Sequence, residues 1–193
     1  MAHVLLFHHV MGLTDGVKAF AERLRRAGHE VEVPDLFGGR VFHSIEAGLE
    51  HARLVGEDQI AEAGMAAARG LPPELVYAGF SMGVAPAMKL VQQRAGARGA
   101  LFLHGIVPLG YFGDRWPAGV PLQIHMMRGD PYEDPAEVQA LAEAAHGELF
   151  EYEAGGHLFT DSSRSGYDPA ATDLVLQRSL EFLGRITNRA PAA

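Results

Sequence analysis

Short apolar runs alternate along this chain with longer segments in which apolar residues recur at helical spacing. Most of the short runs are apolar on both faces, as strands buried in a parallel sheet are. Alternation of such strands with helices predicts an α/β fold, with a mostly parallel sheet of about six to seven strands and helices on both of its faces. The predicted strands are Val4–Phe7, Glu30–Val33, Glu74–Ala78, Ala100–Leu103, Leu122–Met126 and Leu149–Tyr152.

Capping residues mark several helix boundaries. Asp15 is the predicted N-cap of the first helix, which ends before Gly28. Asp134-Pro135 and Asp168-Pro169 open two later helices, because proline is tolerated in the first helical turn after an aspartate cap. The segment 44–68 is rich in Ala and Glu and is interrupted by glycines, so the pattern allows one bent helix or two.

The length of 193 residues, with 48% hydrophobic and 21% charged residues, predicts one globular domain over residues 1–193. The Ala- and Pro-rich end, residues 188–193, is predicted to be a flexible tail. The first apolar run is too short for a secretion signal or a membrane span, so a cytoplasmic location without membrane attachment is the expectation.

Charge and cysteine content limit the possible partners. The formal net charge is −8 and Lys and Arg do not cluster, which argues against a nucleic-acid surface. The chain has no cysteine, which excludes disulfides, thiolate metal sites and a cysteine nucleophile. A small-molecule substrate is therefore the expected partner, and monomer and homodimer both stay open.

A Gly-x-Ser-x-Gly motif carries the strongest functional signal. It comprises Gly79-Phe80-Ser81-Met82-Gly83 and stands between a predicted strand and a helix-compatible segment. The motif is short and also occurs in ordinary glycine-rich turns, but this position is the one that a nucleophile elbow requires. In such an elbow the serine is strained, and side chains two residues on either side of it would collide with neighbouring elements. Ser81 is therefore the predicted nucleophile.

An acid and a base follow in the order that this turn type favours. Serine needs a histidine to take its proton and a carboxylate to hold that histidine in the right tautomer. Asp130 follows a predicted strand in Arg-Gly-Asp-Pro-Tyr, and His157 follows a later strand in Gly-Gly-His-Leu-Phe. Asp130 is the predicted acid and His157 the base. Glu133 and Asp134 are alternative acids, although Pro135 favours Asp134 as a helix cap.

Two backbone amides are predicted to form the oxyanion hole. The amide of Met82 lies in the first turn after the nucleophile, and that of Val10 lies in the loop after the first strand, at the edge where ligands gather in open α/β sheets. The further candidates for substrate binding are His9, Phe37, His104 and Phe159. Phe42, Tyr111 and Trp116 are also candidates for an apolar pocket wall, although aromatic residues in loops more often cover the core.

No metal site is predicted. His8, His9, His104 and His125 lie in or beside predicted strands, but histidines without a carboxylate or thiolate at fixed spacing are a weak metal signal. Hydrolysis by a serine triad needs no cofactor.

Taken in order, the motifs resemble those of the dienelactone hydrolase family, whose members have the α/β-hydrolase fold. The resemblance spans nearly the whole chain, and it implies Ser81 as nucleophile, Asp130 as acid, His157 as base, and the amides of Val10 and Met82 as oxyanion donors. The motifs that carry it are His-His-Val-Met-Gly-Leu, Val-Pro-Asp-Leu-Phe-Gly-Gly, Gly-Phe-Ser-Met-Gly, Arg-Gly-Asp-Pro-Tyr and Gly-Gly-His-Leu-Phe-Thr-Asp.

The chain departs from this family's pattern at the substrate site. Members that open dienelactones use a cysteine where this chain has Ser81, and a thiol-activating glutamate where it has His9. They also carry an arginine after the catalytic histidine that holds the substrate carboxylate, and Thr160 and Asp161 occupy that stretch here. The departures agree with a serine mechanism and predict a substrate other than a dienelactone. Whether His9 replaces the glutamate functionally stays open.

The sequence therefore predicts a serine hydrolase that cleaves a carboxylic ester or lactone through an acyl-enzyme. A thioesterase or acyltransferase would use the same triad, so these activities remain alternatives. A catalytically silent binding protein with this fold is another, which the complete set of serine, acid and histidine disfavours.

Overall fold

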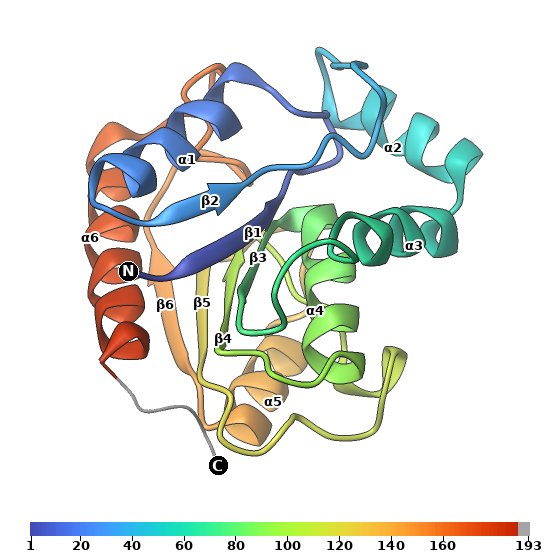
Figure 1. Ribbon diagram of the computed structural model, residues 1–193. Coiled ribbons are helices and arrows are strands. Elements are labelled where there is room, and N and C mark those ends of the chain that lie inside the picture. The colour runs from blue at the N-terminus through green and yellow to red at the C-terminus, as the bar shows by residue number, and fades with distance from the viewer. Residues whose placement is uncertain (189–193) are drawn as a thin grey trace.

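The computed structural model describes residues 1–188, and a six-stranded parallel sheet with the order β2-β1-β3-β4-β5-β6 forms its centre (Figure 1). All six predicted strands are present. The strands are β1 (His3–Phe7), β2 (Glu30–Glu32), β3 (Val76–Phe80), β4 (Gly99–Leu103), β5 (Leu122–Met127) and β6 (Glu148–Tyr152). β3 begins and ends two residues later than predicted, so Gly79 and Phe80 of the serine motif belong to the strand.

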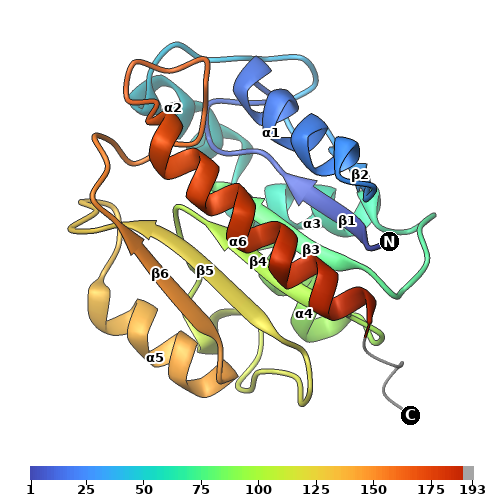
Figure 2. The same ribbon diagram turned by 90° about the vertical axis from the view of Figure 1, so that its left-hand side faces the viewer.

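Helices cover both faces of the sheet, as predicted. Figures 1 and 2 show α1 and α6 on one face, and α4 and α5 on the other, with α3 beside α4. The helices are α1 (Asp15–Arg26), α2 (Ile45–Val55), α3 (Glu57–Ala67), α4 (Val84–Gln93), α5 (Pro135–Ala145) and α6 (Pro169–Thr187), and short 3-10 turns span Ser81–Gly83 and Leu109–Tyr111.

Alternate side chains of each central strand pack into different cores. Val4 and Leu6 of β1 join the cluster under α1 and α6, whereas Leu5 and Phe7 join the cluster under α4 and α5. Successive side chains of a strand point to opposite faces, so a sheet covered twice needs apolar residues at every position. This requirement explains the continuous apolar runs in the sequence.

Two helix caps agree with the sequence prediction and one differs. Asp134 and Asp168 cap α5 and α6 as predicted. Asp15 was the predicted N-cap of α1, but the cap is Thr14, whose Oγ1 accepts a hydrogen bond from the Val17 amide at 3.2 Å. Thr14 has extended backbone angles and Asp15 is already helical, so the negative charge of Asp15 lies in the first turn, where the helix dipole favours it.

The segment 44–68 forms two helices. They meet at Gly56, whose φ of 92° and ψ of 136° end α2 and precede α3. An L-residue with a side chain rarely adopts that φ, so glycine makes the break possible here. The predicted flexible tail, 188–193, lies outside the described residues except for Asn188, which is the C-cap of α6.

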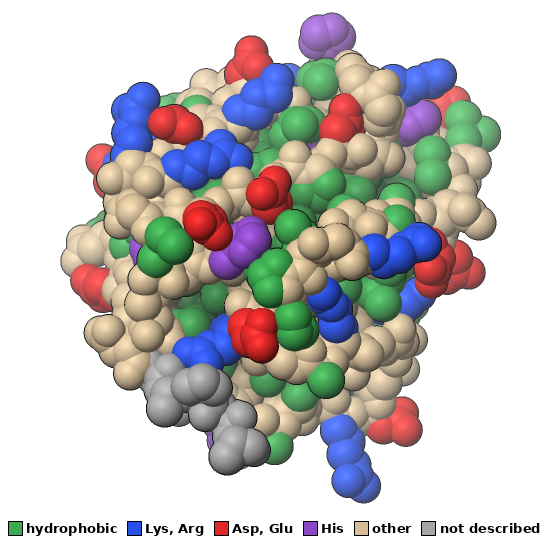
Figure 3. Space-filling model, in the orientation of Figure 1, with side chains coloured by type: hydrophobic (Ala, Val, Ile, Leu, Met, Phe, Trp, Pro, Cys, Tyr) green, Lys and Arg blue, Asp and Glu red, His purple; other side chains and the backbone are tan. Residues whose placement is uncertain are grey.

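The surface carries both signs of charge. On the face shown in Figure 3, basic and acidic side chains are interspersed, with apolar side chains between them. Within residues 1–188, no helix combines the length and the apolar character that crossing a bilayer requires.

Four histidines are fully buried among the strands and the loops that follow them: His8, His9, His104 and His125. His8 accepts a hydrogen bond from the Leu36 amide at 3.0 Å, and His125 lies 2.7 Å from the Tyr152 hydroxyl. Burial disfavours the imidazolium form. It lowers the pKa of His8 to about 4 and that of His125 to about 3, and it lowers the pKa of His104 well below the usual value.

We expect the free energy of unfolding to decrease as the pH falls below about 6.5, the pKa of histidine in an unfolded chain. Below that pH the unfolded chain binds protons that the buried histidines cannot bind, and each contributes up to about 1.4 kcal/mol per pH unit. Glu133, whose pKa burial raises to about 7, has the opposite effect, because the folded chain binds its proton more tightly than the unfolded chain does. It is a single group against the three histidines whose pKa is lowered. Urea midpoints at pH 7.5, 6.0 and 5.0 measure the effect.

His125→Gln is expected to weaken this pH dependence, because glutamine does not titrate. The matched control is His43→Gln, which changes an exposed histidine and is expected to leave the dependence as it is. Equal midpoints at pH 7.5 and 5.0 in the unmodified protein would contradict the prediction.

Candidate active site

The serine motif forms the sharp turn that the sequence predicts. Ser81 directly follows β3 and has a φ of 48°, in the left-handed region. A Cβ on Gly79 would lie 2.2 Å from the Gly83 carbonyl oxygen, and one on Gly83 would lie 2.5 Å from the Phe7 carbonyl oxygen. Both distances are too short for a side chain, so the predicted collisions are confirmed.

His157 lies within hydrogen-bonding distance of both Ser81 and Asp130. The distance from Ser81 Oγ to His157 Nε2 is 2.8 Å, and that from His157 Nδ1 to Asp130 Oδ2 is 2.7 Å. The three residues follow β3, β6 and β5, so the carboxyl ends of the parallel strands bring them together. The fold thereby joins side chains that are far apart in the sequence.

The hydrogen bonds define the state of the histidine ring. A carboxylate accepts hydrogen bonds, so Nδ1 of His157 carries the proton that it donates to Asp130. Nε2 then holds a lone pair that accepts the Ser81 hydroxyl proton. The other oxygen of Asp130, Oδ1, accepts the Tyr132 amide at 3.1 Å, so both carboxylate oxygens have partners.

The two alternative acids have other contacts. Asp134 caps α5 by accepting the Ala136 amide at 2.8 Å. Glu133 accepts the Ile106 amide at 3.2 Å through Oε2. The structure therefore pairs Asp130, and neither of these two carboxylates, with the imidazole of His157.

A cavity of about 620 Å³ opens beside Ser81 and His157. Val10 and Met82, the two predicted oxyanion residues, also line it. Much of the wall is aliphatic and includes Ile45, Leu49, Ile60, Ile106 and Val107, whereas its charged residues are Arg53, Glu57 and Glu133. No sequence motif marks this aliphatic wall, much of which α2 and α3 supply.

The other predicted substrate-binding residues do not line the cavity. His9, His104 and Phe159 are fully buried behind it. Phe37 packs in the apolar cluster that contains Val10 and Ala52, which line the cavity, but Phe37 itself does not line it. Of the five aromatic residues expected in a pocket wall, only Tyr111 lines this cavity.

The rings of Tyr132 and His104 are neighbours of the His157 ring. The Tyr132 ring lies 4.6 Å from the His157 ring, centroid to centroid, on the cavity side. The His104 ring lies 6.2 Å away. Nε2 of His104 is 2.6 Å from Thr160 Oγ1, and its backbone φ of 61° is unusual for a residue with a side chain. The imidazole of His157 therefore lies between an exposed tyrosine and a buried histidine.

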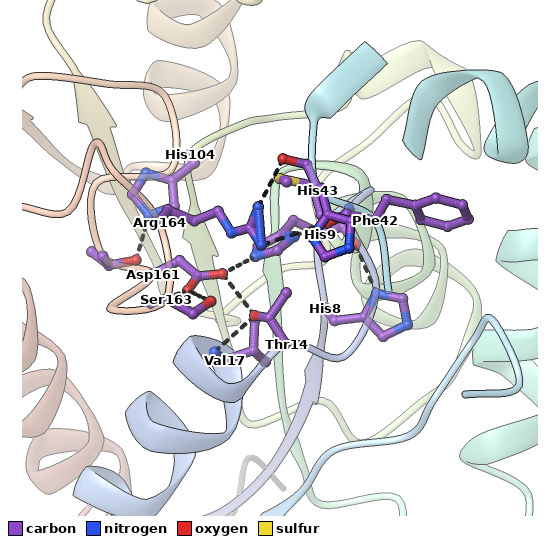
Figure 4. A network of polar contacts seen from close by, with 12 residues as sticks. His8, His9, Thr14, Val17, Phe42, His43, His104, Asp161, Ser163 and Arg164 are labelled. Carbon is purple, nitrogen blue, oxygen red and sulfur yellow. Dashed lines mark hydrogen bonds and ion pairs between the residues drawn. The ribbon is translucent and has the colours of Figure 1, made fainter. Parts of the chain in front are cut away.

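A buried hydrogen bond between His9 and Asp161 joins the loop after β1 to the loop that follows His157 (Figure 4). His9 Nε2 is 2.7 Å from Asp161 Oδ2, and the Met11 amide donates to His9 Nδ1 at 3.3 Å. Asp161 also accepts the Thr14 hydroxyl at 2.7 Å and the Ser163 hydroxyl at 2.6 Å. Burial opposes ionisation of Asp161, but its hydrogen bonds outweigh burial and hold the carboxyl pKa well below its usual value.

This network fixes the loop that carries Val10. Val10 lies between His9, whose side chain contacts Asp161, and Met11, whose amide contacts the His9 ring. Within residues 1–188 the structure contains no group of three or more histidine, aspartate or glutamate side chains arranged to hold a metal ion.

We expect Gly83→Ala to destabilise the fold by at least about 3 kcal/mol, because overpacking against rigid backbone is costly. A new methyl group would overlap the backbone of Phe7 and His8, neither of which can yield as a flexible side chain would. Chemical denaturation measures the change.

Gly184→Ala is the matched control. Gly184 lies inside α6 with open space around a new Cβ, so alanine is expected to stabilise the protein by about 0.5–1 kcal/mol. A Gly83→Ala protein as stable as the unmodified chain would show that the turn is not as tight as described.

Comparison with solved structures shows the same fold elsewhere. A dienelactone hydrolase-like promiscuous phosphotriesterase from metagenomic libraries is 18% identical, with a TM-score of 0.72 over 96% of this chain and 87% of that one. Dienelactone hydrolase from Anabaena variabilis is 16% identical, with a TM-score of 0.68 over 96% and 86%. A protein of Xanthomonas campestris pv. campestris, described as a hydrolase of the alpha/beta superfamily, is 23% identical, with a TM-score of 0.65 over 96% and 99%.

These identities are low, so the structural matches establish the fold alone. No curated protein matches the sequence. The family model described as "Dienelactone hydrolase family", however, matches residues 1–187. The match spans nearly the whole chain and agrees with the motifs and the fold, and the protein therefore belongs to the dienelactone hydrolase family.

Proposed function

We propose that this protein is a serine hydrolase that cleaves a carboxylic ester or lactone through an acyl-enzyme. The observation that carries the proposal is the continuous line of hydrogen bonds from Ser81 Oγ through the His157 ring to Asp130, at 2.8 and 2.7 Å. Membership of a hydrolase family supports the same conclusion at a coarser level.

Acylation begins when Nε2 of His157 takes the Ser81 hydroxyl proton and Oγ attacks the substrate carbonyl carbon. The carbonyl π electrons move to oxygen and form a tetrahedral oxyanion. His157 then gives the proton to the leaving alkoxide as the C–O bond breaks, which leaves Ser81 acylated. Asp130 holds the imidazole in the required tautomer and stabilises the imidazolium.

Deacylation repeats these steps with water. His157 takes a proton from water, the hydroxide adds to the acyl carbon, and Ser81 Oγ leaves and recovers the proton. In both steps the amides of Val10 and Met82 are the proposed donors to the oxyanion, since both residues line the cavity beside Ser81.

The cavity favours a substrate with an aliphatic acyl or alcohol group. Its wall includes five branched aliphatic side chains, and burial of each substrate methylene there contributes up to about 0.8 kcal/mol. The carboxylate-holding arginine that the family resemblance implies is missing, and the stretch in question holds Asp161. A dienelactone is therefore not the proposed substrate.

We expect Ser81→Ala to abolish turnover of p-nitrophenyl butyrate, with kcat falling at least about a thousandfold, because the nucleophile is lost. It is also expected to abolish labelling by a fluorophosphonate, with the adduct in the unmodified protein located at Ser81 by mass spectrometry. The melting temperature is expected to stay within a few degrees, since only one hydroxyl is removed.

The same assay separates the alternative functions. Turnover of acyl-thioesters well above that of esters and lactones would indicate a thioesterase, and product formation with an added alcohol acceptor would indicate an acyltransferase. Absence of both labelling and turnover in the unmodified protein would indicate a catalytically silent binding protein.

We expect kcat/KM to rise from p-nitrophenyl acetate to hexanoate, by up to about fourfold per methylene. Leu49→Gln is expected to flatten this rise, because a polar amide replaces part of the aliphatic wall. Leu54→Gln is the matched control on the same helix, since Leu54 is 81% exposed and does not line the cavity. An identical chain-length profile in all three proteins would rule out this cavity as the acyl site.

A further inference from the structure

Glu133 is a carboxylate in the wall of the active-site cavity that the triad does not use. Its Oε1 would lie 3.0 Å from a Cβ built on Gly105, and the same Cβ would lie 3.1 Å from the Cα of Ser81. The two residues therefore border the space that a side chain at Gly105 would fill. Glu133 lies beside the position that the substrate carbonyl must reach.

The carboxylate of Glu133 is held in place by the backbone and has no cationic partner. Oε2 accepts the Ile106 amide at 3.2 Å. Among the ion pairs of the described residues, none includes Glu133. A charge in this position is therefore directed at whatever occupies the cavity.

The electrostatic surroundings of Glu133 are mainly acidic. Burial first, and then the charges of Asp130 and Glu137, raise its pKa to about 7 against the opposing effect of the Ile106 hydrogen bond. The other titratable or charged groups that line the cavity are Arg53, Glu57, Tyr111, Tyr132 and His157. Glu133 is consequently neutral in acid and ionised in mildly basic solution.

We infer that Glu133 determines substrate specificity: it admits neutral acyl groups and, when ionised, excludes those that carry a carboxylate close to the scissile ester. Two like charges in a cavity whose wall is largely apolar repel each other more strongly than in bulk water. Protonation of Glu133 removes the repulsion and leaves a hydrogen-bond donor in its place. This inference rests on the proposed ester hydrolysis by Ser81.

The test compares two esters of the same shape. Monoethyl succinate carries a carboxylate that is ionised above about pH 5.5, and ethyl succinamate carries a neutral amide at the same position. Release of ethanol gives kcat/KM for each between pH 5.5 and 8.5. The ratio of the two values cancels any effect of pH that acts equally on both esters.

In the unmodified protein we expect the preference for the neutral ester to increase roughly tenfold from pH 5.5 to 8.5. In Glu133→Gln the preference should be small and independent of pH, because glutamine keeps the acceptor for the Ile106 amide but carries no charge. Glu143→Gln is the matched control: Glu143 is exposed on α5 outside the cavity, and this variant should keep the pH dependence.

The outcomes separate the two proposals. A ratio that does not change with pH in the unmodified protein, or one that changes equally in Glu133→Gln, overturns the role of Glu133 while ester hydrolysis stands. Hydrolysis of neither ester, together with no fluorophosphonate adduct on Ser81, overturns the proposed function and the inference with it. Circular dichroism of each variant shows that the protein compared is folded.

Discussion

The left-handed backbone of Ser81 is the constraint on which the site depends. A φ of 48° is costly for a residue with a side chain, and it persists because the surrounding backbone determines it. Gly79, Gly83 and Gly105 each present a bare Cα where a Cβ would meet neighbouring backbone at 3.1 Å or less. Close packing of backbone against backbone thus holds the serine above the sheet edge, where the cavity and the imidazole of His157 can reach its hydroxyl.

Topology then decides what surrounds that serine. β1 and β3 are neighbours, but the helices that follow them, α1 and α4, lie on opposite faces of the sheet. The loops after these strands diverge and leave a crevice at the switch point, where open α/β sheets bind ligands. The His9–Asp161 pair closes one side of this crevice, because it ties the loop that bears Val10 to the segment after His157. Gly48 of α2 closes another side: a Cβ there would lie 2.4 Å from the Val10 carbonyl oxygen.

Local patterns allowed the strands, most helix ends and the triad to be predicted, because apolar runs, Asp-Pro caps and the serine motif each have a short-range physical cause. The cavity wall was different. Its aliphatic residues on α2 and α3 face Ser81 only because Gly48 lets α2 approach the β1 loop, a long-range contact without a sequence signature. His104 and Phe159 were placed near the site by their neighbours in the chain, but their rings turn into the buried layer behind His157. The Thr14 cap escaped notice since Asp15, beside it, is also a good capping residue.

Two of the three places where this chain departs from the family pattern are in contact with each other. The resemblance implies a glutamate at residue 9 and an arginine in the stretch that holds Asp161. This chain instead has a histidine at residue 9 and a carboxylate at residue 161. Changing one partner alone would remove a hydrogen bond from a buried polar group, which destabilises the fold. Exchange of both keeps the contact and removes a fixed cation from the surroundings of the substrate. The position of Glu133 is consistent with that change. Its carboxylate lies in the cavity wall without a cationic partner, so the cavity suits a substrate that carries no negative charge.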